Sequence, residues 1–255
     1  MSPPPILAVQ GLRVSYGRIE AVRGIDLHVA DGEFVGVIGS NGAGKTSLLR
    51  AITGVVRPTG GSVTFAGKLT TGEASHRMVA RGLAMVPEGR MVFADQTVHD
   101  NLVLGAFTRV AGDPSGVAAD IERTLEMFPR LRDRIAQQAG TLSGGEQQML
   151  AIARGLLSQP KLLVIDELSL GLAPKILETL FPVLIDLNRQ GLSILLVEQM
   201  ASYALAVTHR TYVMENGRVL LEGASTALAT DERVLGAYLG RRPSGGPPAG
   251  VLAPV

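Results

Sequence analysis

One eight-residue segment constrains the fold of this chain more than any other. Residues Gly39 to Thr46 read Gly-Ser-Asn-Gly-Ala-Gly-Lys-Thr and fit the pattern G-x-x-x-x-G-K-[ST]. An apolar run, Glu33 to Gly39, precedes the segment, and a helix-compatible run, Ser47 to Thr53, follows it. Glycines in such a turn let successive N–H groups point at phosphate oxygens, and the helix adds its positive dipole end. The segment therefore predicts a phosphate-binding loop between a buried strand and a helix.

The expected contacts to phosphate groups come from nine consecutive residues. Lys45 should reach the β- and γ-phosphates of a nucleotide, and the Thr46 hydroxyl should ligate Mg²⁺. The remaining members of the predicted binding loop share a backbone that faces the phosphates: Gly39, Ser40, Asn41, Gly42, Ala43, Gly44 and Ser47.

An acidic pair, Asp166-Glu167, ends the apolar run Leu162-Leu163-Val164-Ile165. A buried strand delivers both carboxylates to the mouth of a parallel sheet, where nucleotides bind. Asp166 is expected to hold Mg²⁺, and Glu167 is expected to polarise the attacking water as general base. Two carboxylates can also be a mere polar strand end, but the phosphate loop elsewhere in the chain favours the functional interpretation.

Three short, mostly apolar runs predict the centre of the fold. They are Glu33 to Gly39, Lys161 to Glu167 and Leu192 to Glu198, and helix-compatible stretches separate them. Such runs, joined by crossovers, are typical of a parallel sheet that is buried on both faces. The fold class expected is therefore α/β, with a P-loop NTPase core and a parallel sheet.

Antiparallel strands are expected on both sides of this core. Apolar and polar residues alternate through 25–29 before a turn at Asp31-Gly32, which predicts an N-terminal antiparallel β subdomain built as a hairpin. Near the other end, Asn216-Gly217 lies between the apolar runs 210–214 and 219–222. Asn-Gly between two such runs is a strong signal for a two-residue hairpin turn.

A long insertion separates the first and second apolar runs. Helical spacing in 101–107 and 121–128 predicts an inserted α-helical subdomain. The expected boundaries place one domain over residues 6–240, divided into a nucleotide-binding core (6–87 and 160–240) and the helical subdomain (88–159). The Pro- and Gly-rich ends, 1–5 and 241–255, are predicted to be disordered.

Composition limits the classes of partner. The 24 Lys and Arg residues against 23 Asp and Glu residues give a net charge of +1 without a concentrated basic stripe, so nucleic acid is not expected to bind. The absence of cysteine excludes disulfides and thiolate metal sites. The start of the chain lacks a secretory pattern, and its apolar runs are too short to span a bilayer, so work at a membrane would need an anchor from another protein.

A third motif, Leu142-Ser143-Gly144-Gly145-Glu146-Gln147-Gln148, precedes a run with helical spacing, 149–157. Ser143 is expected to cap this helix, while the glycines leave its N-terminus open to an anion. The order of phosphate loop, LSGGEQQ and LLVIDE resembles the nucleotide-binding subunits of ABC transporters over about residues 5 to 240. The resemblance implies binding and hydrolysis of ATP, with Mg²⁺, coupled to transport across a membrane.

The same resemblance implies partners. In that family the LSGGEQQ signature of one subunit closes on the γ-phosphate held by the phosphate loop of another, so Ser143, Gly144 and Gly145 would serve the nucleotide of a partner. The implied partners are a second ATPase subunit (a heterodimer in the complex, or a homodimer of the isolated chain), two membrane permease subunits and, indirectly, an external solute-binding protein. The implied location is the cytoplasmic face of the cell membrane.

Four positions depart from the usual residues of the family. Glu88 stands where a glutamine is usual, and Gln199 where a histidine follows the last core strand. Ala173 replaces an aspartate that crosses the dimer, and Leu168 replaces the proline after the catalytic glutamate. The segments VPEGR, SLGLAP and VEQ together resemble the second ATPase subunit of importers of branched-chain (hydrophobic) amino acids.

Three further residues are expected at the reaction centre by the same resemblance. Gln199 can hydrogen-bond a γ-phosphate or water but cannot become a cation near pH 7 as histidine can. Glu88 would sense or ligate Mg²⁺, with Mg²⁺ or a basic neighbour such as Arg90 offsetting its charge; a solvated loop carboxylate is the alternative. Tyr16 matches the aromatic residue that stacks on adenine, although a tyrosine near a strand end often only packs.

Two other functions fit these motifs. One is an ABC importer ATPase for another small polar solute, such as urea or amides. The other is a non-transport ABC regulatory ATPase that rarely turns over, which Gln199 and Ala173 favour and Glu167 opposes. ABC ATPases that act on DNA or ribosomes usually carry a coiled-coil insertion or two fused cassettes, and the sequence contains neither.

Overall fold

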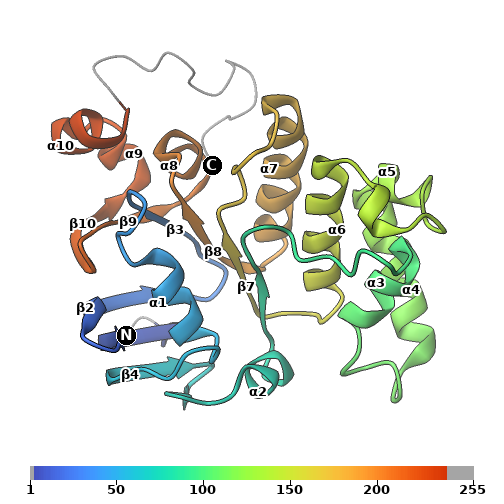
Figure 1. Ribbon diagram of the computed structural model, residues 1–255, viewed down its shortest axis with the longest axis horizontal. Helices are drawn as coiled ribbons and strands as arrows, with labels where there is room; N and C mark the ends of the chain where they lie inside the picture. The colour runs from blue at the N-terminus through green and yellow to red at the C-terminus, as the bar shows by residue number, and fades with distance from the viewer. Residues whose placement is uncertain (1–2, 240–255) are drawn as a thin grey trace.

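A six-stranded sheet runs through the middle of the protein (Figure 1). The computed structural model describes residues 3–239. The strands lie in the order β10-β9-β3-β8-β7-β6, and all neighbours are parallel except β10 and β9. Their bounds are β3 (Phe34–Ile38), β6 (Leu83–Val86), β7 (Leu162–Asp166), β8 (Ser193–Glu198), β9 (Arg210–Glu215) and β10 (Arg218–Ala224).

The three predicted core strands are confirmed as β3, β8 and β7, which lie side by side in the centre of the sheet. Every residue of these three strands is buried, as their nearly continuous apolar sequences require in a sheet covered on both faces. The sequence did not reveal β6 or the parallel pairing of β9 with β3. Both depend on contacts between distant segments, and β6 is only four residues long.

A second, four-stranded antiparallel sheet has the order β2-β1-β4-β5. Its strands are β1 (Leu7–Tyr16), β2 (Ile19–Val29), β4 (Gly60–Phe65) and β5 (Lys68–Leu69). The expected N-terminal hairpin is present, but its turn lies at Gly17-Arg18 between β1 and β2. The turn at Asp31-Gly32 instead carries the chain from β2 into β3, and therefore from one sheet to the other.

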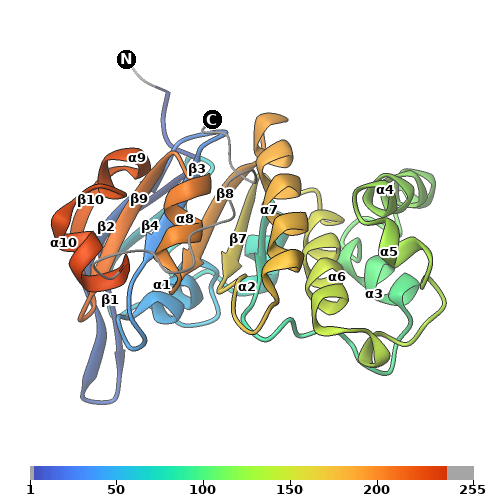
Figure 2. The ribbon, with the colours of Figure 1, turned by 90° about the horizontal axis from the view of Figure 1, so that it is seen from above.

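Two apolar cores lie on opposite faces of the six-stranded sheet. On one face, Val35 and Val37 of β3 pack with the antiparallel sheet and with α1 (Lys45–Ile52). On the other face, Phe34 and Ile38 pack with the cluster that includes α6 (Gly144–Leu156), α7 (Pro174–Arg189) and α8 (Ala201–Val207). Figure 2 shows α7 and α8 lying along the strands. This double cover fixes β3 and β7, whose carboxyl ends carry the predicted site residues.

Between residues 88 and 159 the described regular elements are helical. They are α3 (Val98–Gly105), α4 (Pro114–Met127), α5 (Pro129–Arg132), the short 3₁₀ turn η1 (Ala139–Thr141) and α6. The predicted helical runs fall in α3 and α4, and these helices lie on the side of the molecule away from the antiparallel sheet (Figures 1 and 2). The exact subdomain boundaries at residues 88 and 160 stay a prediction.

The C-terminal hairpin is confirmed. Asn216 and Gly217 connect β9 and β10 with φ of 49° and 78°, the two left-handed conformations that favour an Asn-Gly turn. Two helices and a final π-type turn follow: α9 (Ser225–Leu228), α10 (Glu232–Val234) and η2 (Leu235–Leu239); α2 (Ser75–Ala80) precedes β6. The predicted disordered tail, 241–255, and residues 1–2 lie outside the described range, while 3–5 form no regular element.

Candidate nucleotide site

The loop between β3 and α1 forms a cradle in which two positions, Gly39 and Gly44, have no room for a side chain. A Cβ added to Gly44 (φ 100°) would lie 2.4 Å from the carbonyl oxygen of Ala21, and one on Gly39 would lie 2.5 Å from that of Met214. Gly44 caps α1 in a left-handed conformation, and no side chain accepts from the first N–H groups of the helix. These open donors and the helix dipole fit an anionic group such as a phosphate.

Lys45 anchors the cradle to the acidic strand end. Its ammonium donates to the carbonyl oxygens of Gly39, at 2.9 Å, and Ser40, at 3.2 Å. It also lies 3.3 Å from Oε1 of Glu167, and the two side chains are only 4% and 9% exposed. Because water screens this buried ion pair only weakly, its attraction is stronger than that of a surface pair. The contact joins the predicted phosphate-binding lysine and the predicted catalytic glutamate in one charged centre.

A hollow of about 450 Å³ opens over this centre. It gathers most of the predicted nucleotide residues, together with two that the sequence did not single out, Ala21 of β2 and Leu170 after β7. The predicted residues that line it are Tyr16, Asn41, Gly42, Gly44, Lys45, Thr46, Ser47, Glu88, Glu167 and Gln199. Gly39, Ser40 and Ala43 belong to the same loop but do not line the hollow. Tyr16 is 43% exposed at the end of β1, so its ring is free to contact a ligand.

Asp166 fits a cation. Its side chain is buried at the end of β7, and neither carboxylate oxygen has a hydrogen-bond partner within the described structure. Burial first, and then the charge of Glu167, raise the pKa of Asp166 to about 6; the neighbouring Thr46 and Lys45 oppose this rise, although Thr46 makes no well-formed hydrogen bond to it. Buried, unpaired carboxylate oxygens beside a hydroxyl are the oxygen ligands that Mg²⁺ prefers, so the residues fit this ion.

A metal ion bound at Asp166 would need further ligands that are not carboxylate side chains of this protein. The described residues contain no group of three or more His, Cys, Asp or Glu side chains placed to hold a metal ion by themselves. A Mg²⁺ ion at Asp166 and Thr46 would therefore complete its shell with water and phosphate oxygens, as is usual for nucleotide-bound Mg²⁺.

Glu167 lies in a strained backbone conformation. Its φ is 49°, in the left-handed region that a residue with a Cβ rarely occupies, at a cost of about 1–3 kcal/mol. Its N–H donates to the carbonyl oxygen of Val197 at 2.9 Å, which holds the strained residue against the end of β8. Strain of this kind persists where the surroundings fix the conformation, and such residues cluster at active sites.

The loop after β6 corrects one expectation. Glu88 is exposed and lines the hollow, and its charge contributes to the raised pKa of Asp166. Arg90 does not pair with it; the guanidinium donates instead to Oε1 of Gln147 on α6 at 3.3 Å. Arg90 and Met91 have φ of 68° and 44°, and this backbone path takes the arginine away from the hollow. Arg90 therefore does not offset the charge of Glu88 by direct contact.

The signature residues Ser143, Gly144 and Gly145 do not line the hollow over their own phosphate loop. Ser143 caps α6 as predicted, because its hydroxyl accepts from the backbone N–H of Glu146 at 3.4 Å. In return, the hydroxyl and N–H of Ser143 donate to the carboxylate of Glu146 at 2.7 and 2.9 Å. A Cβ on Gly145 would lie 2.8 Å from Ile176 of α7, so the glycine also permits close packing. Their expected contact with the nucleotide of a partner stays a prediction.

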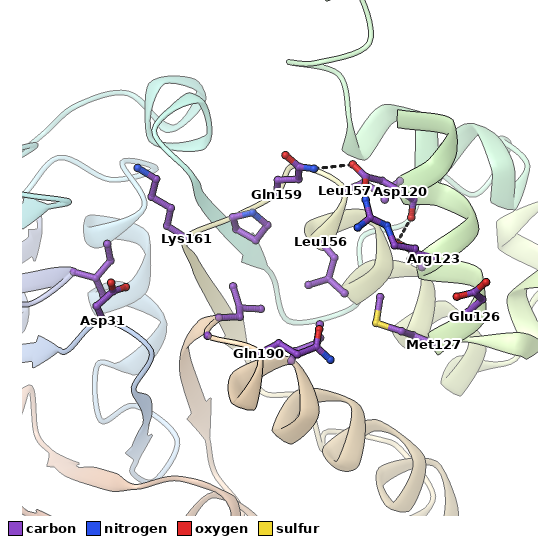
Figure 3. A pocket seen from close by; sticks show the side chains of 16 residues that line it. Asp31, Asp120, Arg123, Glu126, Met127, Leu156, Leu157, Gln159, Lys161 and Gln190 are labelled. Atoms are coloured by element: carbon purple, nitrogen blue, oxygen red, sulfur yellow. Dashed lines mark hydrogen bonds and ion pairs between the residues drawn. The ribbon is translucent and has the colours of Figure 1, made fainter. Parts of the chain in front are cut away.

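A larger hollow, of about 950 Å³, lies elsewhere (Figure 3). It is lined by α4, the ends of α6 and α7, and the residues just before β7 and β8. The side chain of Gln159 donates to Asp120 at its rim, and Arg123 pairs with the same carboxylate. None of the predicted site residues lies here, and the hollow is at the amino ends of the strands, whereas ligands of α/β sheets bind at the carboxyl ends.

Glu198 is a residue of the site region that sequence reasoning passed over. Its carboxylate is fully buried at the end of β8 and accepts from the backbone N–H of Ser169 at 2.9 Å and from its hydroxyl at 2.6 Å. Burial raises the pKa of Glu198 to about 7, although the hydrogen bonds from Ser169 oppose the rise. A charged residue closing the apolar run LSILLVE was the available signal.

A glycine cradle with a buried lysine, beside two carboxylates at the carboxyl edge of a parallel sheet, defines the site of a P-loop nucleoside triphosphatase. The profile of the family described as "ABC transporter" matches residues 22–169. The chain belongs to the ABC transporter family, whose ATP-binding cassettes are ATPases coupled to transport.

Individual relatives agree with this assignment. The chain is 43% identical over 235 residues to the high-affinity branched-chain amino acid transport ATP-binding protein BraG of Pseudomonas aeruginosa, covering 92% of this chain and 100% of the relative. It is 34% identical to the probable branched-chain amino acid transport ATP-binding protein LivF of Archaeoglobus fulgidus, covering 87% and 93%. A crystal structure of an ATP-binding cassette of an ABC transporter superposes with a TM-score of 0.83 at 26% identity, covering 93% and 100%. Within residues 3–239, each helix is too short or too polar to span a bilayer.

Proposed function

We propose that this chain is the ATP-hydrolysing subunit of an importer of branched-chain (hydrophobic) amino acids. It would work at the cytoplasmic face of the cell membrane, with a second ATPase subunit and two membrane permease subunits, while an external solute-binding protein delivers the cargo. The names of the two relatives described above support the amino-acid cargo. The observation that most directly supports ATP hydrolysis by this chain is the buried contact between Lys45 of the phosphate loop and Glu167 after β7.

ATP would bind with its phosphates against the loop of β3 and α1. The open N–H groups of the loop and the ammonium of Lys45 would bind the β- and γ-phosphates, and Tyr16 would stack on adenine at the rim. Thr46 and Asp166 would hold Mg²⁺, with Glu88 nearby. When bound, the ion supplies charge neutralisation for the phosphate oxygens.

Hydrolysis would use the carboxylate of Glu167 as general base. Glu167 borders the hollow and its strained backbone is fixed by β8, so its carboxylate can orient a water molecule toward the γ-phosphate and accept a proton from it. Gln199 borders the same hollow and can donate or accept a hydrogen bond there. Because it stays uncharged, Gln199 would add no positive charge to the transition state.

A complete site would need two subunits. The phosphate loop and the signature residues Ser143, Gly144 and Gly145 of this chain lie apart, so each can complete the site of a partner. Head-to-tail closure of two subunits over ATP, followed by hydrolysis and reopening, would drive the permease subunits through the helical segment 88–159. Each chain would then contribute its phosphate loop to one ATP site and its signature residues to the other.

The experiment that tests the proposed function measures solute-stimulated hydrolysis by the assembled importer. The chain is co-purified with its permease subunits and second ATPase subunit in lipid vesicles, and phosphate release is followed with solute-binding protein loaded with leucine, isoleucine or valine. We expect these solutes to stimulate phosphate release and the Glu167→Gln complex to show no stimulation. Stimulation by urea or amides alone would contradict the cargo, and a rate that no solute changes would favour a regulatory ATPase.

A further inference from the structure

The ends of β7 and β8 are tied together by one carboxylate. Glu198, the last residue of β8, accepts two hydrogen bonds from Ser169, which lies three residues beyond the end of β7. The backbone N–H of Ser169 is 2.9 Å from Oε1, and its hydroxyl is 2.6 Å from Oε2. Both side chains are buried, so water does not compete for these bonds. The two-point contact, termed here the Glu198–Ser169 latch, therefore holds the chain after β7 against β8.

The strained residue Glu167 lies two residues before Ser169, the partner in this latch. One residue before the latch on β8, the carbonyl oxygen of Val197 accepts from the N–H of Glu167 at 2.9 Å. The last two residues of β8 thus hold the chain both at Glu167 and at Ser169, on either side of the buried Leu168. A left-handed glutamate relaxes unless its neighbours prevent it, since the conformation costs about 1–3 kcal/mol. The latch supplies the second of these two anchors.

The same contact fixes the place where Gln199 leaves the sheet. Gln199 follows Glu198 directly and borders the hollow, as does Glu167. Glu198 itself is 0% exposed and does not border the hollow. It therefore acts on the site through its neighbours and not by touching a nucleotide.

We propose that Glu198 is a positioning residue for ATP hydrolysis, because its latch to Ser169 holds the strained turn that aims Glu167 into the hollow. The inference rests on the proposed function, in which Glu167 activates water. Stability alone gives no reason for a carboxylate at this position, since an apolar residue of similar volume at a buried charged site is often neutral or stabilising. A role in positioning explains the carboxylate, because a side chain without acceptor atoms cannot bind the N–H and the hydroxyl of Ser169.

The test compares two uncharged replacements of similar size. Glu198→Gln keeps the latch, since its amide oxygen can accept from the N–H of Ser169 and its NH₂ can donate to the hydroxyl. Glu198→Leu removes it. We expect Glu198→Leu to lower kcat for phosphate release by about 10- to 100-fold, the effect of small misplacements at a reaction centre, with ATP affinity unchanged. Glu198→Gln should stay within about threefold of wild type in kcat, since the latch persists.

The outcomes separate positioning from a purely structural role. Wild-type kcat in Glu198→Leu, or a parallel loss of kcat, ATP affinity and melting temperature, would overturn the proposal. Should Glu198→Leu not fold, Ser169→Ala decides, with Ser158→Ala as a control serine that hydrogen-bonds within its own helix end. Ser169→Ala must lower kcat at unchanged ATP affinity, and equal rates in the two serine variants would overturn the proposal. If the wild-type complex releases no phosphate, the proposed function itself has failed.

Discussion

The buried carboxylate of Glu198 makes the stability of the protein depend on pH in a calculable way. Burial, with a smaller contribution from the charge of Glu167, raises the pKa of Glu198 from 4.5 to about 7 in the folded protein. Between these values the folded state binds more protons than the unfolded state, so the free energy of unfolding falls as pH rises. The stabilisation from this group is complete below pH 4.5 and is lost as pH rises through about 7. At about 1.4 kcal/mol for each pH unit, it amounts to roughly 3 kcal/mol.

Glu198→Gln removes this dependence, because the amide does not titrate and keeps both partners on Ser169. Relative to wild type, the variant should therefore gain roughly 3 kcal/mol in free energy of unfolding between pH 4.5 and pH 8. Urea titrations at pH 4.5, 6, 7 and 8 measure this difference. Asp166, whose pKa is also raised, contributes to both proteins and cancels to first order.

The matched control is Glu126→Gln, which changes an exposed glutamate on α4 in the same way. Its stability difference from wild type should stay nearly flat over the same range. A flat difference for Glu198→Gln as well, with unchanged m-values, would refute the argument that burial without full compensation raises the pKa of Glu198.

Three further predictions concern the nucleotide. Glu167→Gln should lower phosphate release by about 10²- to 10⁴-fold while Mg·ATP binding persists, and filter binding with a phosphate-release assay checks both. Tyr16→Ala should weaken ATP binding by about 2- to 10-fold, whereas Tyr16→Phe keeps the ring and should match wild type in a calorimetric titration. Glu88 places a carboxylate beside the triphosphate site, so ATP binding by wild type should depend more steeply on Mg²⁺ than binding by Glu88→Gln; equal Mg²⁺ titrations would exclude this effect.

Local sequence patterns predicted the centre of the fold and most of the residues around the hollow. The phosphate loop has fixed spacing because its backbone must wrap an anion. The three central strands are mostly apolar because helices cover one face of their sheet and the antiparallel sheet with α1 covers the other. Asn216-Gly217 was equally readable, since its turn requires two positive φ angles in succession. Each of these features is set by residues that are adjacent in the chain.

Features that arise between distant segments were not readable. The pairing of β9 with β3 depends on register between strands that are far apart in the chain. Arg90 was expected near Glu88, but two left-handed residues redirect the loop and give its guanidinium to Gln147. The importance of Glu198 appears only when the neighbouring strand end brings Ser169 within hydrogen-bond distance. Proximity of this kind is a property of the folded chain.

The most direct test of the account is nucleotide binding by the Lys45→Ala variant. Lys45 is buried between the phosphate loop and Glu167, while Lys161, the control, is exposed at the opposite edge of the sheet. Equilibrium binding of Mg·ATP should fall by about 100-fold or more in Lys45→Ala, the loss of a charge-assisted contact to phosphate in a weakly screened site, and stay unchanged in Lys161→Ala. Equal ATP affinity and turnover in wild type and Lys45→Ala would contradict the account.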